Sequence, residues 1–433
     1  MTQTPVPVPP PNRMRALLSS LSVRVLAALA LGLAAGAAVQ VWGVPGGAGT
    51  TGMIDAVGQL WLNALRMTIV PLVFSLLVVG IATISDAAHT GRLARRALVW
   101  FGVLIAAASV YAVLAAYGLL ALWPIDAEGG ARLLAGIPPA PDNIGAVAPF
   151  SEFVKTIAPA NVVRAAAEDA ILGLVVFAVF FGFALTRLPA RLKVPLVTLF
   201  EAVSEAMIIV VRWVLLAAPV GVFALAMGVG LSAGVSAAGT LAHYVSIVSL
   251  SVIGMILLCY PLAVVAGRVG LAKFARAVAP AQVVAVSTQS SLASLPVMVE
   301  RAVDELDVSR QTAGLVLPLA VALFRMTSPV ANLAVVIYCA HLFGLEPSLG
   351  QIGAAMLTAI LISIGSVGLP GQISFFASVA PICIAMGVPL EMLPLLLAVE
   401  VIPDIFRTVG NVTADLTVAR IVSQGEGVAV SVE

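Results

Sequence analysis

Residues 287 to 296 read Ser287-Thr288-Gln289-Ser290-Ser291-Leu292-Ala293-Ser294-Leu295-Pro296, a polar stretch inside an otherwise apolar segment that runs from 277 to 300. Basic residues stand on both sides of that segment: Lys273, Arg276, Arg301 and Arg310. Because Lys and Arg gather in cytoplasmic loops, both ends are expected on the same face of a membrane. A segment that enters and leaves on one face is a re-entrant hairpin, whose irregular tip must be buried in protein or line a cavity.

The composition of the whole chain agrees with a membrane location. Of its 433 residues, 61% are hydrophobic and 10% are charged, and the mean hydropathy is +1.12. This is more apolar surface than a soluble core could bury. A net charge of +1, with no basic cluster, excludes a nucleic-acid partner. The three cysteines lie in apolar runs without a CxxC spacing, so neither a disulfide framework nor a zinc site is expected.

Apolar runs long enough to cross about 30 Å of hydrocarbon predict eight membrane-spanning helices. They lie near 16–42, 57–83, 97–123, 168–186, 206–229, 244–267, 311–344 and 393–421. Arg13 and Arg15 place the N-terminus in the cytoplasm. The first run is long and leads into a second membrane segment, so we expect a retained helix rather than a signal peptide.

A second broken segment lies between the last two predicted spans. It reads Ser363-Ile364-Gly365-Ser366-Val367-Gly368-Leu369-Pro370-Gly371-Gln372, and no Lys or Arg occurs between Leu345 and Pro394. Gly and Pro at this density break a helix. The order hairpin, span, hairpin, span therefore predicts an inverted repeat, an arrangement associated with secondary transporters. The alternative is one helix kinked by Gly and Pro.

The last predicted span carries a row of polar and charged residues. They are Glu400, Asp404, Arg407, Asn411 and Asp415, whose spacings of 4, 3, 4 and 4 place them on one face of a helix. Charges inside a membrane are costly and usually functional. Arg407 offers a guanidinium fork that binds a carboxylate, which points to an anionic substrate, and Asp404 suits an ammonium group. The alternative is that these two side chains pair with each other.

Several motifs together resemble one known family, the dicarboxylate/amino acid:cation symporters, which include the glutamate and aspartate transporters. The motifs, in chain order, are residues 67–80, residues 218–225, the tip at Ser290 to Pro296, the tip at Ser363 to Gly371, and the stretch from Asp404 to Asp415. They cover nearly the whole chain. The resemblance implies an all-α polytopic membrane protein with eight transmembrane helices and two re-entrant hairpins.

The resemblance also implies a homotrimer that moves its substrate by an elevator motion. Scaffold helices would occupy residues 16–93 and 150–230. The moving transport domain would comprise 94–123 and 236–423, with hairpins at 271–304 and 347–383 and with helices at 310–344 and 388–423. Residues 1–15 and 424–433 would be tails. We expect a multi-pass protein of a bacterial inner membrane, with both termini in the cytoplasm.

Carried over by position, the resemblance implies roles for individual residues. Arg407 would bind the side-chain carboxylate of the substrate and Asp404 its amino group. The other expected substrate contacts are Thr408, Asn411, Ser328, Ser290, Ser291, Gly368 and Leu369. Since relatives specialised for plain dicarboxylates usually lack an acid at position 404, an acidic amino acid is the expected substrate.

The chain departs from the family pattern at its sodium ligands. Phe324-Arg325-Met326-Thr327-Ser328 replaces the motif Asn-Met-Asp-Gly-Thr, and Leu104-Ile105 replaces a Thr-Ser pair. Hard cations need oxygen ligands, and only Asn411 and Asp415 survive as residual sodium ligands. We therefore expect no sodium coupling and no cofactor. Asn332 replaces a proton-accepting Glu of animal relatives, which leaves Glu400, Asp404 or Asp415 to carry a coupled proton.

Arg325 appears in the same motif from which the sodium ligands are lost. Its expected partners are Asp415 and Glu400, because no acid lies near it in sequence. Our hypothesis is a tethered cation that neutralises Asp415, so that Arg325→Met would weaken substrate binding without making it sodium-dependent. The alternative is a structural salt bridge away from the substrate.

Two other classes of protein compete with a symporter. An intramembrane hydrolase would need an activated Ser with His or a metal, whereas the three histidines fall near predicted span ends and no HExxH motif occurs. We therefore expect no enzyme. An uncoupled exchanger or facilitator, or a substrate sensor on the same fold, stays open.

Overall fold

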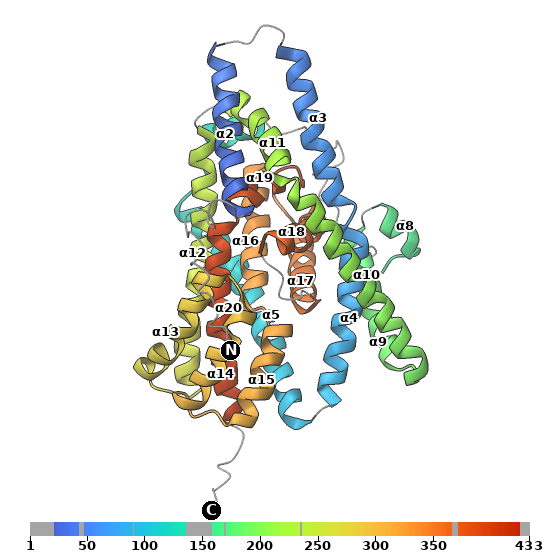
Figure 1. Cartoon of the computed structure of the whole chain (residues 1–433), viewed down its shortest axis with the longest axis vertical. Coiled ribbons are helices and arrows are strands. Elements are labelled where there is room, and N and C mark those ends of the chain that lie inside the picture. Colours follow the sequence, from blue (N-terminus) through green and yellow to red (C-terminus); the bar gives the residue numbers. More distant parts are fainter. Residues whose placement is uncertain are drawn as a thin grey trace, which may run out of the picture.

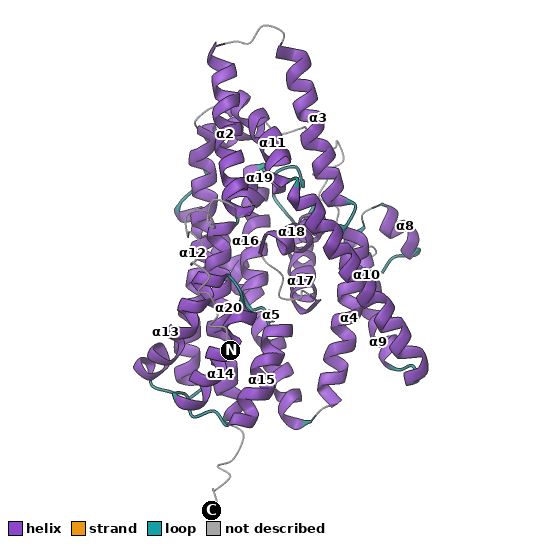
Figure 2. Cartoon of the chain, in the orientation of Figure 1, coloured by secondary structure: helices purple, strands orange, loops and turns teal. Residues whose placement is uncertain are grey.

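The computed structural model describes residues 21–42, 47–89, 91–135, 158–168, 170–233, 236–365 and 371–424. Within these ranges every regular element is a helix and no strand occurs (Figure 1, Figure 2). The prediction of an all-helical protein is thereby confirmed. Two predicted substrate contacts, Gly368 and Leu369, and the tail residues 1–15 and 425–433 lie outside the described residues.

The helices are named as in Figure 1. In chain order they are α2 (Leu21–Trp42), α3 (Gly47–Arg66), α4 (Ile69–His89), α5 (Arg92–Leu122), α6 (Ala127–Ala135), α8 (Val162–Ala167), α9 (Ile171–Thr186), α10 (Ala190–Leu216), α11 (Ala218–Ala233), α12 (Ser236–Val265), α13 (Leu271–Thr288), α14 (Ser291–Asp304), α15 (Arg310–Leu323), α16 (Thr327–Leu342), α17 (Leu349–Gly365), α18 (Gly371–Met386), α19 (Leu393–Val399) and α20 (Val401–Ser423).

The helices have the length and surface of membrane spans. Five stretches of the described chain are long and apolar enough to cross a bilayer: Gly52–Ala88, Arg92–Leu122, Ala190–Leu216, Ala237–Val265 and Arg310–Leu342. Large apolar side chains such as Leu114, Phe180 and Trp213 lie exposed on outer helix faces. Exposed apolar surface of this extent fits hydrocarbon rather than water.

Four of the long helical segments are interrupted just before a proline. A proline stands in the first turn of α4, α11, α16 and α20, at Pro71, Pro219, Pro329 and Pro403. Proline is tolerated in a first turn, where no N–H is needed, but in a continuous helix its ring would clash with the carbonyl four residues earlier. Each of these four segments breaks just before its proline, although other prolines, such as Pro261 in α12, lie inside continuous helices. Two of the breaks place Arg325 and Glu400.

The helical segment that contains the fifth predicted span is longer than its apolar run. The apolar run begins near 206, but α10 begins at Ala190 and α11 continues the segment to Ala233. The first turns of α10 carry exposed charged residues such as Arg191 and Glu201. These residues lower the local hydropathy without disfavouring a helix, since Arg and Glu are good helix formers.

The centre of the molecule is built from α16 and α20. Residues Thr327 to Ala340 of α16 are all buried, and most of α20 is buried as well. Helix α12 packs against both, and α5 packs against α16. Polar side chains on α20 therefore face protein rather than lipid.

Two helix pairs approach this centre. Helices α13 and α14 pack together at the lower end of the view in Figure 1, and both contact α20. Their turn is made by Gln289, which adopts a left-handed conformation with φ 50°, and by Ser290, which caps α14. Helices α17 and α18 pack together beside α16. Re-entry of the two pairs into a membrane stays a prediction.

Candidate substrate-binding site

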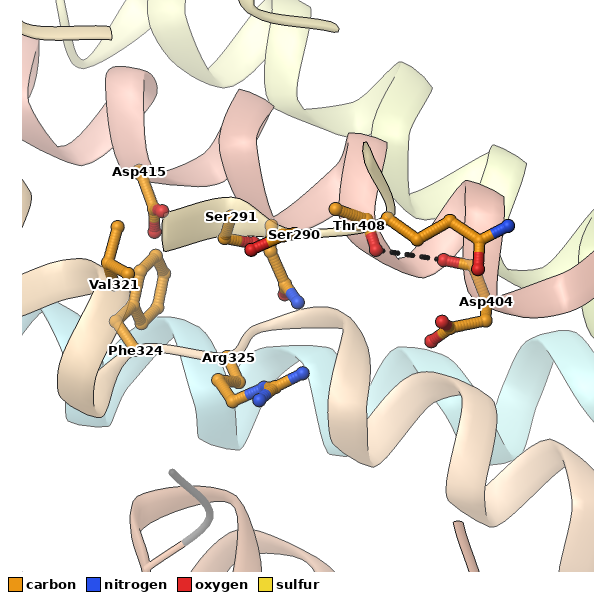
Figure 3. Close-up of a pocket in the computed structure, with 10 residues that line it drawn as sticks. Ser290, Ser291, Val321, Phe324, Arg325, Asp404, Thr408 and Asp415 are labelled. Carbon is orange, nitrogen blue, oxygen red and sulfur yellow. Dashed lines mark hydrogen bonds between the residues drawn. The ribbon is translucent and has the colours of Figure 1, made fainter. Parts of the chain in front are cut away.

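A small cavity lies where the α13–α14 turn, the α15–α16 break and α20 meet (Figure 3). Its volume is about 20 Å³, which is room for about one water molecule. It brings together seven of the predicted site residues: Ser290, Ser291, Arg325, Asp404, Thr408, Asn411 and Asp415. Gln289, Val321 and Phe324 complete its lining.

A second, smaller cavity continues the first along α20. It is lined by Arg325, Thr327, Ser328, Ser378, Asp404, Arg407 and Asn411. Both cavities share Arg325, Asp404 and Asn411. The predicted substrate contacts from three separate parts of the chain therefore line one continuous polar region, which is closed to anything much larger than water in this conformation.

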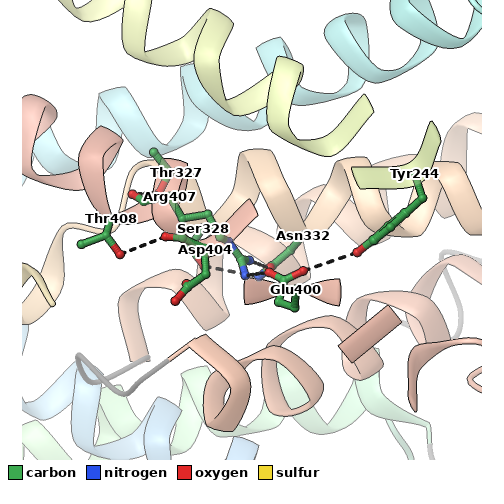
Figure 4. Close-up of polar contacts among 8 residues, drawn as sticks. All are labelled: Tyr244, Thr327, Ser328, Asn332, Glu400, Asp404, Arg407 and Thr408. Carbon is green, nitrogen blue, oxygen red and sulfur yellow. Dashed lines mark hydrogen bonds and ion pairs between the residues drawn. The ribbon is translucent and has the colours of Figure 1, made fainter. Parts of the chain in front are cut away.

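Arg407 is the centre of a buried polar network (Figure 4). Its Nη1 lies 2.5 Å from Oε1 of Glu400, and its Nη2 donates to Oδ1 of Asn332. The hydroxyl of Tyr244 donates to the other oxygen of Glu400 at 3.4 Å. Glu400, Asn332 and Tyr244 are fully buried, and Arg407 is 7% exposed. The guanidinium predicted to bind a substrate carboxylate thus already holds a carboxylate of its own chain.

Two members of this network, Asn332 and Tyr244, were not predicted as site residues. Asn332 was considered only as a position that lacks an acid, although an amide within the apolar α16 is itself a signal of a buried polar partner. Its Nδ2 also donates to Oγ of Ser328 at 3.3 Å, which connects the predicted contact Ser328 to Arg407. Tyr244 gave no signal, because an aromatic residue early in an apolar helix is ordinary.

Thr327 joins α16 to α20. Its backbone N–H and its hydroxyl lie 3.1 and 2.8 Å from Oδ1 of Asn411, and the hydroxyl also lies 2.9 Å from the carbonyl of Arg407. The helices come this close because residue 410 is glycine: a Cβ there would lie 2.4 Å from Cγ2 of Thr327. The backbone N–H of Thr327 donates to the side-chain oxygen of Asn411, and the single hydroxyl proton of Thr327 goes either to this oxygen or to the carbonyl of Arg407. A role of Asn411 as a residual sodium ligand stays a prediction.

Asp415 is fully buried, and neither of its oxygens has a hydrogen-bond partner among the described residues. Within the described chain, Asp415 therefore accepts no hydrogen bond from Arg325, and their expected pairing stays a prediction. Glu400, the other expected partner, gives its hydrogen bonds to Arg407 and Tyr244 instead. In Figure 3 the side chain of Arg325 runs along the cavity toward Asp404 and away from Asp415. Arg325 lies in the break before α16, between Asp415 and Asp404, and its side chain points toward Asp404.

The positions that lost the family's sodium ligands form an apolar cluster. Phe324 stacks on Phe101, with ring centroids 4.7 Å apart and an angle of 12° between the rings. Leu104, Ile105 and Met326 are buried. Within the described part of the chain, no three His, Cys, Asp or Glu side chains form a group that could hold a metal ion. The residues present therefore fit a packed contact between α5 and the helix break better than a cation site.

The turn between α13 and α14 presents the start of a helix to the cavity. The Oγ atom of Ser290 accepts a hydrogen bond from the backbone N–H of Ala293 at 3.2 Å, so this hydroxyl is used as a helix cap. Ser291 is the first residue of α14 and lines the cavity. Unsatisfied N–H groups at a helix start favour an anion.

Comparison with known proteins agrees with this arrangement of residues. Residues 21–424 match the model of the sodium:dicarboxylate symporter family. The chain is 28% identical to a proton/glutamate-aspartate symporter of Escherichia coli (strain K12), over 94% of each chain. It is 26% identical to a C4-dicarboxylate transport protein of Bacillus subtilis (strain 168), over 93% of this chain and 94% of that protein. A proton/sodium-glutamate symport protein of Geobacillus stearothermophilus is 27% identical, over 86% and 88%. The polar row on α20, the paired helices and this match over nearly the whole length agree, and the chain belongs to the sodium:dicarboxylate symporter family.

Proposed function

We propose that this protein is a secondary transporter of an acidic amino acid or a related dicarboxylate. The observation that carries the proposal is the contact between the Arg407 guanidinium and the Glu400 carboxylate, buried beside a polar cavity. A site that holds a carboxylate in this way has the chemistry to hold one from a substrate. Relatives over nearly the full length are glutamate-aspartate and C4-dicarboxylate transporters.

The same contact suggests how transport is coupled. A substrate carboxylate that binds Arg407 must displace Glu400, which then lies buried without its cation. Tyr244 from α12, Asn332 from α16, and Asp404 and Arg407 from α20 are the polar and charged groups around it. None of these remaining groups offers a second cation, and a buried carboxylate without a cation is costly. Proton uptake by Glu400 removes this cost and couples substrate binding to a proton.

Sodium coupling is not part of this proposal. Phe324 and Met326 supply no oxygen, and the side-chain oxygen of Asn411 is engaged by Thr327. Sodium prefers a cage of oxygen ligands, as other hard cations do. Proton coupling needs only a carboxylate, here that of Glu400, that loses its cationic partner when substrate binds and then takes up a proton.

We further propose the elevator motion and the domain division that the family resemblance implies. Residues 16–93 and 150–230 would form a scaffold in a homotrimer, while 94–123 and 236–423 move with the substrate. The protein would lie in a bacterial inner membrane with both termini in the cytoplasm. The supporting observation is that the cavity is lined by residues from the expected moving part alone.

Uptake into proteoliposomes tests the proposal. Labelled L-aspartate and succinate are offered with an inward proton gradient, with a sodium gradient or with neither, and exchange is measured with substrate inside. We expect proton-driven accumulation of at least one substrate, unaffected by replacing sodium with choline. Arg407→Met should abolish uptake, whereas Arg164→Met, which removes an exposed charge paired with Glu168, should not.

Other outcomes identify the competing functions. Exchange without accumulation would identify an uncoupled exchanger or facilitator. Substrate binding with neither uptake nor exchange would identify a sensor. Sodium-driven accumulation would contradict the proposed coupling.

A further inference from the structure

Arg325 is a cation built into the wall of the cavity. It lies in the break between α15 and α16, is half-buried and lines both parts of the polar region. A guanidinium keeps its charge in proteins, whatever its surroundings. Any ligand that enters this region therefore meets the fixed positive charge of Arg325 in addition to Arg407, which is paired with Glu400.

Asp404 is the acid that accompanies Arg325 along the whole polar region. Both side chains line both cavities, whereas Asp415 lines only the first. Figure 3 agrees, since the Arg325 side chain is directed toward Asp404. The cation expected from the sequence to accompany Asp415 is therefore directed toward Asp404 instead.

This arrangement changes what Asp404 can do for a ligand. By resemblance, Asp404 would attract the ammonium group of an acidic amino acid. In this chain that ammonium would have to lie beside the Arg325 guanidinium, and two like charges in a region of low dielectric repel each other strongly. The positive charge beside the Asp404 carboxylate is instead that of Arg325.

The charge balance of the cavity leads to the same conclusion. Its lining holds two cations, Arg325 and Arg407, and two acids, Asp404 and Asp415. Without Arg325, the acids of the lining would outnumber its cations, and an ammonium group bound there would be stabilised. Arg407 is already paired with Glu400, so Arg325 is the lining cation that offsets the two acids, and a ligand gains most if it brings carboxylates and no further cation.

We propose that Arg325 is a specificity-determining residue that takes the place of a substrate ammonium group, so that the site selects a dicarboxylate without an amino group over an acidic amino acid. This inference rests on the proposed function and narrows its substrate class. It reverses the preference for an acidic amino acid that the presence of Asp404 alone suggests.

Calorimetric binding of succinate and L-aspartate to the purified full-length protein tests this inference. We expect the wild type to bind succinate more tightly. Arg325→Met should shift the ratio of the two dissociation constants toward L-aspartate by about tenfold or more, the size of one charge-assisted interaction. The double variant Arg325→Met with Asp404→Asn should lose that gain, because the carboxylate that receives the ammonium is gone.

Two further variants separate specificity from folding. Arg325→Lys keeps the charge and should keep the preference for succinate. Arg301→Met removes a half-buried charge on α14 that pairs with Glu300 and Glu305, and should leave the ratio unchanged. Thermal unfolding shows whether each variant is folded.

Two results would overturn the inference. One is tighter binding of L-aspartate by the wild type, and the other is an unchanged ratio in a folded Arg325→Met variant. If no folded variant binds either ligand, the proposed function fails and the inference fails with it, whereas a changed preference alone leaves the transporter proposal intact.

Discussion

The guanidinium of Arg407 and the carboxylate of Glu400 are bonded at 2.5 Å across two turns of the same polypeptide segment. Glu400 lies in the break before α20, and Arg407 lies in the second turn of that helix. Both side chains are buried, and removing one partner of a buried pair typically costs about 3–5 kcal/mol because the other charge is left behind. In the proposed mechanism this pair is a closed state of the anion site, which a ligand or a proton opens.

Replacing Glu400 with Gln should tighten substrate binding. The neutral amide competes less well for Arg407, and we expect the dissociation constant of the transported acid to fall by about tenfold, the range of a hydrogen bond to a charged group. Calorimetry on the purified variant measures the change. Weaker binding would show that Glu400 supports the ligand rather than competing with it.

The same variant should lose its response to pH. In the wild type, protonation of Glu400 frees Arg407, so substrate binding should strengthen as the pH falls toward acidic values. In Glu400→Gln no proton is exchanged at this position, and binding should be nearly flat over the same range. In proteoliposomes the variant should exchange substrate but fail to accumulate it under a proton gradient, and retained proton-driven accumulation would assign coupling to another group.

Asn332 should act as a positioning residue for Arg407. Replacing Asn332 with Leu keeps the approximate volume but removes the oxygen that accepts from Nη2 of Arg407. We expect binding of the transported acid to weaken by about tenfold. Thr358→Val is the matched control, because the buried hydroxyl of Thr358 has no hydrogen-bond partner among the described residues. Equal effects of the two changes would argue against the role of Asn332.

Gly410→Ala should push α20 away from α16. A Cβ at this position would lie 2.4 Å from Cγ2 of Thr327, and overpacking of this kind typically costs about 1–3 kcal/mol. We expect a lower midpoint of thermal unfolding and weaker substrate binding, since Thr327 also holds Asn411. Gly314→Ala on α15 is the control, because a Cβ there meets nothing within 4 Å; it should leave both measurements nearly unchanged.

Arg66 and Glu391 should control transport without controlling binding. Nη2 of Arg66, at the end of α3, lies 2.8 Å from Oε1 of Glu391, in the segment between α18 and α19. In the proposed division, this pair joins the scaffold to the moving part. Arg66→Glu should slow uptake into proteoliposomes and leave calorimetric binding intact. Combining it with Glu391→Arg should restore part of the rate, and a double variant no better than the single one would contradict a direct pair.

The sequence alone was sufficient to predict most of the helices and the row of polar residues that α20 contributes to the site. Apolar runs, basic flanks and the Gly and Pro signals predicted helices and a hairpin within 277–300, where the structure has the helix pair α13 and α14, because helix formation and breaking depend on neighbouring residues. The spacing of the polar row on α20 follows from the helix period and likewise needs no tertiary information. The helix that contains the fifth predicted span begins before its apolar run, because hydropathy measures burial in lipid, whereas the charged first turns of α10 are also compatible with a helix.

Only the tertiary structure decided which charges face each other. Arg407 is bonded to Glu400 and Asn332, and Arg325 is directed toward Asp404 rather than Asp415. These choices depend on the rotation of α16 against α20, which is set by the break before Pro329, the break before Pro403 and the close contact at Gly410. Sequence spacing states which residues share a helix face, but electrostatic partners are chosen by distances of a few ångströms between helices that are far apart in the chain.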